Sequence, residues 1–280
     1  MSEFVTIEQI DAATNYIRSK TKLSPKIGLV LGSGLGGLAD SVKDAVVIPF
    51  KDIPNWPVST IQGHAGRLLI GSLFGKPAMV MQGRIHYYEG YSMAEVTFPI
   101  RVMQRLGVEV LILTNAAGAI SPDFAPGDVM IITDHINMVG MSGLNPLRGP
   151  NLDEFGERFP DMSQPYDHEL IKFAKKAAKE KGIEYHKGVY ICLSGPSFES
   201  PADLRFMRII GADAVGMSTV PETIVARHGH MRVLGISGIS NKANLDGSTE
   251  TTHEEVLAAG EVIVPKLTGI IQGVIEKLSL

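Results

Sequence analysis

Ile27-Gly28-Leu29-Val30-Leu31-Gly32-Ser33-Gly34-Leu35-Gly36-Gly37 is the stretch of this sequence that decides the fold. Its first five residues form a short apolar run, which is typical of a buried strand. The glycines that follow allow a tight turn, and the hydroxyl of Ser33 stands between two of them. Because backbone N–H groups in such a turn can cradle an oxyanion, the stretch predicts a strand that ends at an anion-binding loop.

The same glycines also satisfy the dinucleotide-binding pattern G-x-G-x-x-G, and Asp52 stands downstream where a ribose-binding acid is expected. We rank that interpretation low, because only residues 38–44 separate the glycines from the next apolar run, Ala45–Ile48. That spacing holds about two helical turns, which is too short for the crossover helix of a dinucleotide fold. A P-loop is excluded because no Gly-Lys-[Ser/Thr] follows.

Short apolar runs recur along the chain, and each is closed by Gly, Ser or Asn. They are Ile27–Leu31, Ala78–Met81, Val108–Leu113, Val129–Ile132, Val189–Leu193, Ala214–Met217 and Val233–Ile236. Helical patterns occupy Thr6–Ser19, Met93–Leu106, His168–Lys181, Pro201–Ile210 and Pro221–His228, and a capping box at 252–255 opens a last helix. Alternating strands and helices predict an α/β sheet with helices on both faces. No repeat or linker interrupts the pattern, so we expect residues 1–280 to form a single domain.

Bulk composition narrows the class of protein. The chain is 44% hydrophobic and 20% charged, an ordinary globular balance, and its net charge of −4 gives no electrostatic case for a nucleic-acid partner. A single cysteine, Cys192, excludes an internal disulfide and fits a reducing compartment. The N-terminus lacks signal-peptide features, and no uncharged apolar run reaches membrane-spanning length. We therefore expect a soluble, cytoplasmic protein without a membrane partner.

Ligands of α/β sheets bind beyond the carboxyl ends of the strands, so the residues after each apolar run are the first candidates for function. Arg84-Ile85-His86-Tyr87-Tyr88 follows one such run. In an extended segment Arg84, His86 and Tyr88 share one face. The arginine offers a planar fork for phosphate oxygens, the histidine a further donor and the tyrosine a surface for a sugar. The alternative is the polar face of an edge strand.

Two further segments are candidates for ligand binding, one for contact with an anion and one for contact between a ligand and the protein backbone. His64 lies between glycines in Gln62-Gly63-His64-Ala65-Gly66-Arg67 and is a candidate phosphate contact. The small residues of Thr114-Asn115-Ala116-Ala117-Gly118-Ala119 would let a ligand touch the backbone, although close packing of a strand on a helix explains Ala117 and Gly118 equally well.

Two polar positions suit a heterocycle. Glu199 stands beside an aromatic ring in Gly195-Pro196-Ser197-Phe198-Glu199, and its carboxylate can accept N–H groups from a purine edge or simply start a helix. Asn241 follows Ile236–Ile239 and can donate and accept at once, although asparagine is also common in turns.

His253 falls in the first turn of the last helix, where the positive helix end favours a neutral imidazole that can bond a hydroxyl. An exposed histidine without a role is an equally good interpretation. No G-x-S-x-G nucleophile motif and no metal-binding motif is found, and His228-Gly229-His230 is expected to end a helix. The irregular stretch Met138–Tyr166, rich in Gly, Pro, Asn and Arg, is expected to be a functional loop or an interface.

Taken together, these motifs resemble the trimeric class of purine nucleoside phosphorylases over nearly the whole chain. Besides the stretches already quoted, the resemblance rests on Tyr88-Glu89-Gly90-Tyr91, Asn145-Pro146-Leu147-Arg148-Gly149-Pro150 and Gly216-Met217-Ser218-Thr219-Val220-Pro221-Glu222. It implies the single-domain α/β nucleoside phosphorylase fold, with a mixed central β-sheet flanked by helices. It also implies phosphorolysis of purine nucleosides to a free base and a pentose 1-phosphate, as in purine salvage, with phosphate as co-substrate and no metal or organic cofactor.

The resemblance also assigns roles by matching positions. The residues expected to hold phosphate are Ser33, His64, Arg84, His86, Ala116 and Ser218. The residues expected around the ribose are Tyr88, Met217, His253 and Tyr190. Those expected around the base are Glu199, Asn241, Phe198, Val215, Ala117 and Gly118. His86, Glu199 and Asn241 are the expected catalytic residues, and Phe159 is expected to reach the site of a neighbouring subunit in a homotrimer.

The match to the family is weakest over residues 242–252, the segment that directly precedes His253. Asn241 resembles the pattern for 6-oxopurines such as inosine and guanosine, whereas relatives that accept 6-aminopurines tend to carry aspartate there. Three alternatives stay open: a methylthioadenosine phosphorylase, against which Asn241 and His253 argue, a nucleoside hydrolase, and a nucleotide-binding sensor that uses the Gly32–Gly37 loop without turnover.

Overall fold

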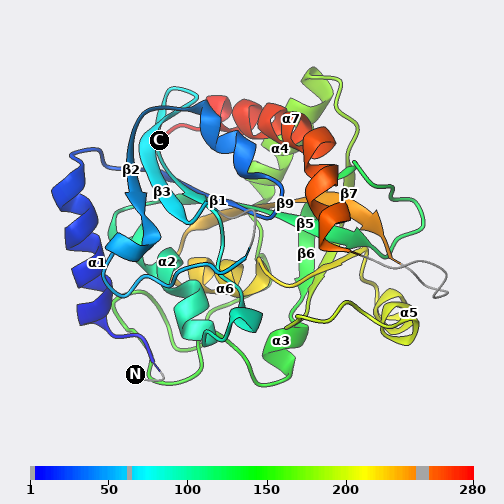
Figure 1. Ribbon diagram of the computed structural model, residues 1–280, viewed down its shortest axis with the longest axis horizontal. Coiled ribbons are helices and arrows are strands. Elements are labelled where there is room, and N and C mark those ends of the chain that lie inside the picture. The colour runs from blue at the N-terminus through cyan, green and yellow to red at the C-terminus, as the bar shows by residue number, and fades with distance from the viewer. Residues whose placement is uncertain (1–3, 62–64, 244–251) are drawn as a thin grey trace.

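The computed structural model describes residues 4–61, 65–243 and 252–280 (Figure 1). Its centre is strand β1 (Ile27–Leu31), in which all five residues are buried. Strand β1 lies between β4 (Lys76–Gln82) and β5 (Val110–Ala119) and runs parallel to both. A run of branched apolar residues suits this place, because a central parallel strand has a covered face on each side. The apolar run that opens the deciding stretch is therefore the core strand that the sequence predicts.

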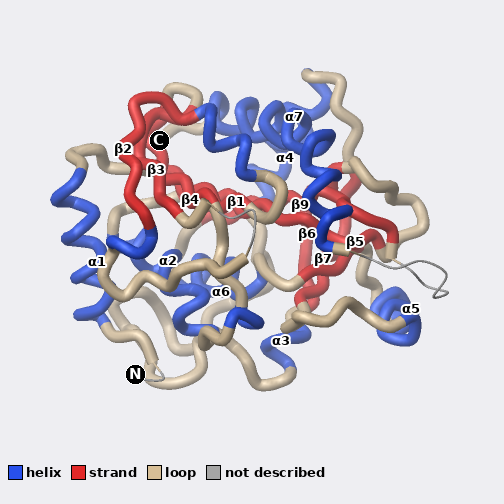
Figure 2. Tube along the Cα trace, viewed as in Figure 1, coloured by secondary structure: helices blue, strands red, loops and turns tan. Residues whose placement is uncertain are grey.

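Among the described residues, one mixed sheet of nine strands runs through the molecule in the order β2-β3-β4-β1-β5-β8-β7-β6-β9 (Figure 2). The remaining strands are β2 (Val42–Pro49), β3 (Arg67–Leu73), β6 (Val129–Ile136), β7 (His186–Cys192), β8 (Ala214–Gly216) and β9 (Arg232–Lys242). Strand β5 also pairs with β9, so β5, β8, β7, β6 and β9 close on themselves. As a result β5 has neighbours on three strands and carries the junction between the open and the closed parts of the sheet.

Helices cover both faces of the sheet, as the alternating pattern predicts. Helices α1 (Ile7–Lys20), α2 (Met93–Arg105) and α6 (Val220–His228) pack together on one face, and α4 (His168–Glu180) and α7 (His253–Lys277) lie on the other (Figure 1). The short helices α3 (Met138–Met141) and α5 (Pro201–Ile209) lie toward the β7 end of the molecule. Each predicted helix is present to within two residues of its predicted bounds.

Helix α7 is long and apolar enough to span a membrane by length and composition over residues Glu254–Lys277. One face of the helix is covered by the protein's own core, because the helix packs on α4 and β9. Buried side chains repeat along this inner face at Ile263, Leu267, Ile270, Ile271, Val274 and Ile275. Such spacing is the mark of a core helix, and packing within the fold accounts for its hydropathy.

The connection after the glycine loop settles the dinucleotide question. A short 3-10 helix, Gly36–Ser41, leads directly into β2, which runs antiparallel to β3. The long crossover helix of a dinucleotide fold is therefore missing between these elements, as the spacing predicts.

Two strand ends differ from expectation, because β5 and β9 continue to Ala119 and Lys242 through residues that we expected to follow the strands. Pairing between these two strands extends their ladder that far.

Candidate active site

A cavity of about 380 Å³ opens beside β5, and most of the residues predicted from the sequence line it. Its volume falls in the range of small-molecule sites. The predicted residues that line it are Ser33, Arg84, His86, Tyr88, Ala116, Ala117, Gly118, Phe198, Glu199, Val215, Met217, Ser218 and Asn241. The fold thus brings the strand-end motifs of the sequence into one place.

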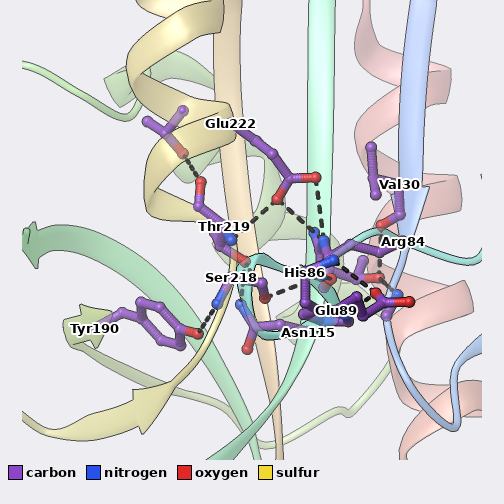
Figure 3. A network of polar contacts seen from close by, with 12 residues as sticks. Val30, Arg84, His86, Glu89, Asn115, Tyr190, Ser218, Thr219 and Glu222 are labelled. Carbon is purple, nitrogen blue, oxygen red and sulfur yellow. Dashed lines mark hydrogen bonds and ion pairs between the residues drawn. The ribbon is translucent and has the colours of Figure 1, made fainter. Parts of the chain in front are cut away.

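Arg84 is the buried centre of one half of this cavity, with only 2% of its surface exposed. Its Nη1 donates to the carbonyl of Thr114 at 2.7 Å and to Oγ of Ser218 at 3.2 Å (Figure 3). Position 32 requires glycine, because an added Cβ would lie 2.9 Å from the Cα atom of Asn115 and 3.2 Å from Nη1 of Arg84. The strand-to-loop turn therefore passes against the guanidinium group, as an anion-binding loop requires.

The turn around Ser33 is closed by a backbone bond from the N–H of Leu35 to the carbonyl of Gly32 at 3.1 Å. Gly34 has φ +73°, a left-handed conformation that glycine adopts without strain. The side chain of Gln82, at the end of β4, donates to the carbonyl of Gly36 at 2.9 Å and ties the loop to the sheet. Ser33 is thus held beside Arg84 by a turn that the glycines make possible.

Glu222 pairs with Arg84 on the side away from the cavity. The sequence analysis quoted Glu222 as the last residue of a motif but assigned it no role. The Nε atom of Arg84 lies 3.0 Å from Oε2 and donates to Oε1 of this carboxylate at 3.1 Å, and both side chains are buried (Figure 3). The carboxylate also accepts the backbone N–H of Thr219 at 3.0 Å. A buried cation and anion thus compensate each other at the base of the cavity.

His86 is fixed by Glu89, a second acid that sequence reasoning missed. The carboxylate accepts the backbone N–H of His86 at 2.7 Å and lies 3.2 Å from its Nδ1. It also accepts the N–H of Thr60 at 2.6 Å. Burial raises the pKa of Glu89, but these hydrogen bonds outweigh it and lower that pKa to about 2. Burial lowers the pKa of His86, with the Glu89 contact opposing it, so the ring is biased toward its neutral form.

The segment that carries His86 and Tyr88 is not extended throughout, which corrects our prediction. Residues Tyr87–Glu89 form a 3-10 turn that begins after His86. The two rings still meet, because they stack with centroids 4.8 Å apart and planes 12° from parallel. A turn that closes onto Glu89 therefore replaces strand alternation as the reason why these side chains share the cavity. Burial raises the pKa of Tyr88 to about 12, so its phenol stays protonated at neutral pH.

A bulge in β9 places Asn241 in the other half of the cavity. Ala117 pairs with Ile239, but the next residue, Gly118, pairs with Asn241, so Ser240 is the extra residue. Bulges of this kind re-aim side chains next to active sites. As a result the successive residues 240 and 241 both line the cavity, and Oγ of Ser240 donates to Oδ1 of Asn241 at 2.8 Å. A Cβ added at Gly118 would lie in van der Waals contact with this amide at 3.4 Å, so the backbone at Gly118 passes directly beside Asn241.

Glu199 lines the same cavity from the segment before α5. Burial raises the pKa of this carboxyl, with its own backbone N–H bond opposing the shift. Within the described part of the chain no basic side chain pairs with this half-buried carboxylate, which suits a ligand that brings N–H donors. Phe198, beside it in the sequence, also lines the cavity and is 46% exposed.

Among the predicted residues whose side chains the structure describes, two do not line the cavity, Tyr190 and Phe159. Tyr190 is fully buried behind the wall, where its hydroxyl accepts the N–H of Ser218 at 3.4 Å. Phe159 lies in the irregular loop and is 85% exposed. His64 lies outside the described residues, and for His253 the structure describes the helix backbone but not the side chain.

Several residues that line the cavity were not predicted. They are Thr60, Ile61, Asn115, Pro196, Gly216, Ser240 and Val256. Asn115 and Gly216 stand inside motifs quoted above, so their place was accessible to sequence reasoning. Thr60, Ile61 and Val256 stand just outside the quoted motifs and carry no motif signal of their own. Within the part of the chain that the structure describes, no group of three or more His, Cys, Asp or Glu side chains converges as metal ligands.

The sequence of this chain matches one family model and several curated proteins over nearly its whole length. The family model described as the phosphorylase superfamily matches residues 26–276. Purine nucleoside phosphorylase 1 of Bacillus subtilis is 52% identical over 270 residues, which cover 96% of this chain and 98% of that protein. Purine nucleoside phosphorylase of Mus musculus is 46% identical over 284 residues, with 100% and 98% covered.

Solved structures agree with the sequence comparisons. Purine nucleoside phosphorylase of Schistosoma mansoni in complex with inosine matches with a TM-score of 0.94 and 40% identity, and covers 100% of this chain and 99% of that chain. The same enzyme in complex with adenosine matches with a TM-score of 0.94 and 42% identity, and both chains are fully covered. Both the fold and the chain length are therefore shared with these structures.

The Glu89→Gln variant tests the support of His86. At pH 7 we expect it to unfold about 1–3 kcal/mol more easily, because an amide has one acceptor oxygen for bonds that two carboxylate oxygens share. The folded-state pKa of Glu89 is about 2, below its ordinary value of 4.5, so its contribution to stability is present above pH 4.5 and is lost as the pH falls toward 2. The gap between the two proteins should therefore narrow in acid.

Urea unfolding followed by the fluorescence of Trp56, the single tryptophan of the chain, measures both effects. Glu184→Gln, at an exposed acid, is the control and should leave unfolding unchanged at each pH. Equal stability of Glu89→Gln and the wild type at pH 7, or a gap that stays constant down to pH 3, would contradict the assigned contacts.

Proposed function

We propose that this chain, which belongs to the phosphorylase superfamily and within it to the purine nucleoside phosphorylases, prefers 6-oxopurine nucleosides. The enzyme cleaves purine nucleosides with inorganic phosphate. Inosine and guanosine, with their deoxy forms, are the proposed substrates, and the products are the free base and ribose or deoxyribose 1-phosphate. The observation that carries the proposal is one cavity that is lined both by the bonded pair Arg84 and Ser218 and by Glu199 and Asn241.

Phosphate is the proposed ligand of the Arg84 half. A guanidinium group presents fixed donors to phosphate oxygens, and the hydroxyls of Ser33 and Ser218 add further donors beside it. The neutral ring of His86 and the backbone at Ala116 complete the proposed phosphate contacts, and His64 is retained as a proposed contact. Because Arg84 is buried, its interaction with a phosphate is screened less than it would be at the surface.

The purine is the proposed ligand of the Asn241 half, and the ribose lies between the two halves. Glu199 would accept the N1–H of a 6-oxopurine, and the Asn241 amide would donate to O6 and N7. Phe198, Val215 and the small residues Ala117 and Gly118 supply apolar surface to the base. Tyr88 and Met217 would contact the ribose, with Tyr190 supporting from behind and His253 at its 5′ end.

Bond cleavage in this arrangement follows from where charge develops. Breaking the N-glycosidic bond leaves positive charge on the sugar and negative charge on the purine, as in other glycosyl transfers through oxocarbenium-like transition states. A donor at Asn241 strengthens its bond as that negative charge arrives, so it stabilises the transition state more than the substrate. Phosphate held beside the sugar carbon then attacks, and positioning both reactants supplies roughly 7 kcal/mol or more in favourable cases.

The proposal also covers the co-substrate, the assembly and the location of the enzyme. Inorganic phosphate is a co-substrate, and the reaction as proposed uses no metal or organic cofactor. We propose a homotrimer in the cytoplasm in which Phe159 reaches a neighbouring site, a role supported by its 85% exposure in an irregular loop. No nucleic-acid or membrane partner is proposed.

Base release from inosine, with and without inorganic phosphate, tests the reaction. We expect hypoxanthine only when phosphate is present, because the phosphate oxygen is the nucleophile. Adenosine assayed in parallel should be cleaved far more slowly. Hypoxanthine release without phosphate would establish a hydrolase, and nucleotide binding without any release would establish a binding protein.

Asn241→Asp tests base specificity. The solved relative is reported with both inosine and adenosine, so occupancy alone does not decide the preference. A carboxylate at this position accepts from a 6-amino group but repels O6, so the inosine-to-adenosine ratio of kcat/KM should fall by about tenfold or more.

The control for this variant is Asn55→Asp, the same change at an exposed asparagine outside the cavity. It should leave the ratio of the two nucleosides unchanged. If the ratio for Asn241→Asp also stays at the wild-type value, Asn241 does not select the base.

A further inference from the structure

Glu222 is a buried carboxylate that touches the proposed phosphate site without lining the cavity. It stands in the first turn of α6, where an acidic residue ordinarily caps a helix. Its contacts go further than a cap, because its two oxygens lie 3.1 and 3.0 Å from Nε of Arg84. The Nη1 atom of the same guanidinium donates to Thr114 and Ser218 (Figure 3). One edge of Arg84 is therefore oriented by Glu222.

The same carboxylate also holds the segment that carries Ser218. Its Oε2 accepts the N–H of Thr219, whose φ of +70° lies in the left-handed region that β-branched residues avoid. The hydroxyl of Thr219 accepts from the side chain of Asn115 at 2.9 Å. These two bonds hold a backbone conformation that would otherwise relax, and that conformation sets where Ser218 points.

Two candidate phosphate ligands from distant parts of the chain thus depend on one carboxylate. Arg84 follows β4, whereas Ser218 follows β8, and Ser218 and Arg84 also bond each other at 3.2 Å. Loss of the carboxylate would leave the arginine without its buried counter-charge and the Thr219 N–H without its acceptor. Neither change touches the Asn241 half of the cavity.

We propose that Glu222 is a positioning residue for phosphate: it fixes the guanidinium of Arg84 and the hydroxyl of Ser218 in one geometry that fits the anion. This inference rests on the proposed function, because it assumes that phosphate binds in the Arg84 half. It goes beyond that function by placing a determinant of phosphate affinity behind the wall of the site.

Glu222→Gln in the full-length enzyme tests the proposal through the two substrates separately. We expect the KM for phosphate to rise by about tenfold or more, because the amide removes the charge and one acceptor. The Kd of hypoxanthine, measured by calorimetry without phosphate, should stay within about twofold of wild type, since the base half is intact. A merely structural role would weaken phosphate and hypoxanthine together.

Glu95→Gln is the matched control. Glu95 caps α2 in the same way, since its carboxylate accepts the N–H of Ser92 at 2.8 Å, but it neither contacts Arg84 nor lines the cavity. Its substitution should leave both constants unchanged. Glu222→Asp keeps the charge on a shorter side chain and provides a second variant if the amide variant fails to fold. It should raise the phosphate KM less than the amide does and spare hypoxanthine.

Three outcomes would overturn the inference. A wild-type phosphate KM in Glu222→Gln, or in Glu222→Asp where the amide variant does not fold, in an enzyme that turns over normally, would reduce Glu222 to a helix cap. An equal loss of hypoxanthine and phosphate affinity in both variants would show a general structural role. A wild type without phosphate-dependent release of hypoxanthine would overturn the proposed function and this inference with it, whereas the first two outcomes leave that function intact.

Discussion

The ion pair between Arg84 and Glu222 is the interaction on which the rest of the site depends. Both side chains are buried, and removing one partner of such a pair typically costs roughly 3–5 kcal/mol, because a charge is left without compensation. The pair joins the segment after β4 to the first turn of α6, and Arg84 adds bonds to β5 through Thr114. A buried guanidinium group can be held away from water and still face a phosphate because the carboxylate of Glu222 compensates its charge.

Strand β5 explains why an anion site and a base site adjoin. It lies beside β1, whose end leads into the glycine loop, and beside β9, whose bulge carries Asn241. The run from Asn115 to Gly118 therefore borders both halves of the cavity. Reaction between a phosphate and a nucleoside needs this closeness, since positioning contributes more than any single contact to a displacement of this kind. Small side chains along β5 leave room for both ligands.

Much of this site could be predicted because its parts are local. Glycines that permit a turn, an arginine after a strand and an amide near a strand end each leave a signature in the sequence. Spatial neighbours without such a signature could not be found: Thr60 and Val256 reach the cavity only through the tertiary fold. Glu222 was missed for another reason, since an acid in a first helical turn is expected as a cap. The end of β9 was also predicted too early. Its residues after Ile239 look like a strand end in the sequence, but β9 continues past the bulge at Ser240 because it stays paired with β5.

A crystal structure of the enzyme with phosphate and hypoxanthine bound together tests the central claim most directly. The account predicts phosphate oxygens within hydrogen-bond distance of Arg84 and Ser218, Glu222 still on Nε of the arginine, and the base between Glu199 and Asn241. Phosphate bound elsewhere, or an Arg84 side chain that leaves Glu222 to reach it, would contradict the account.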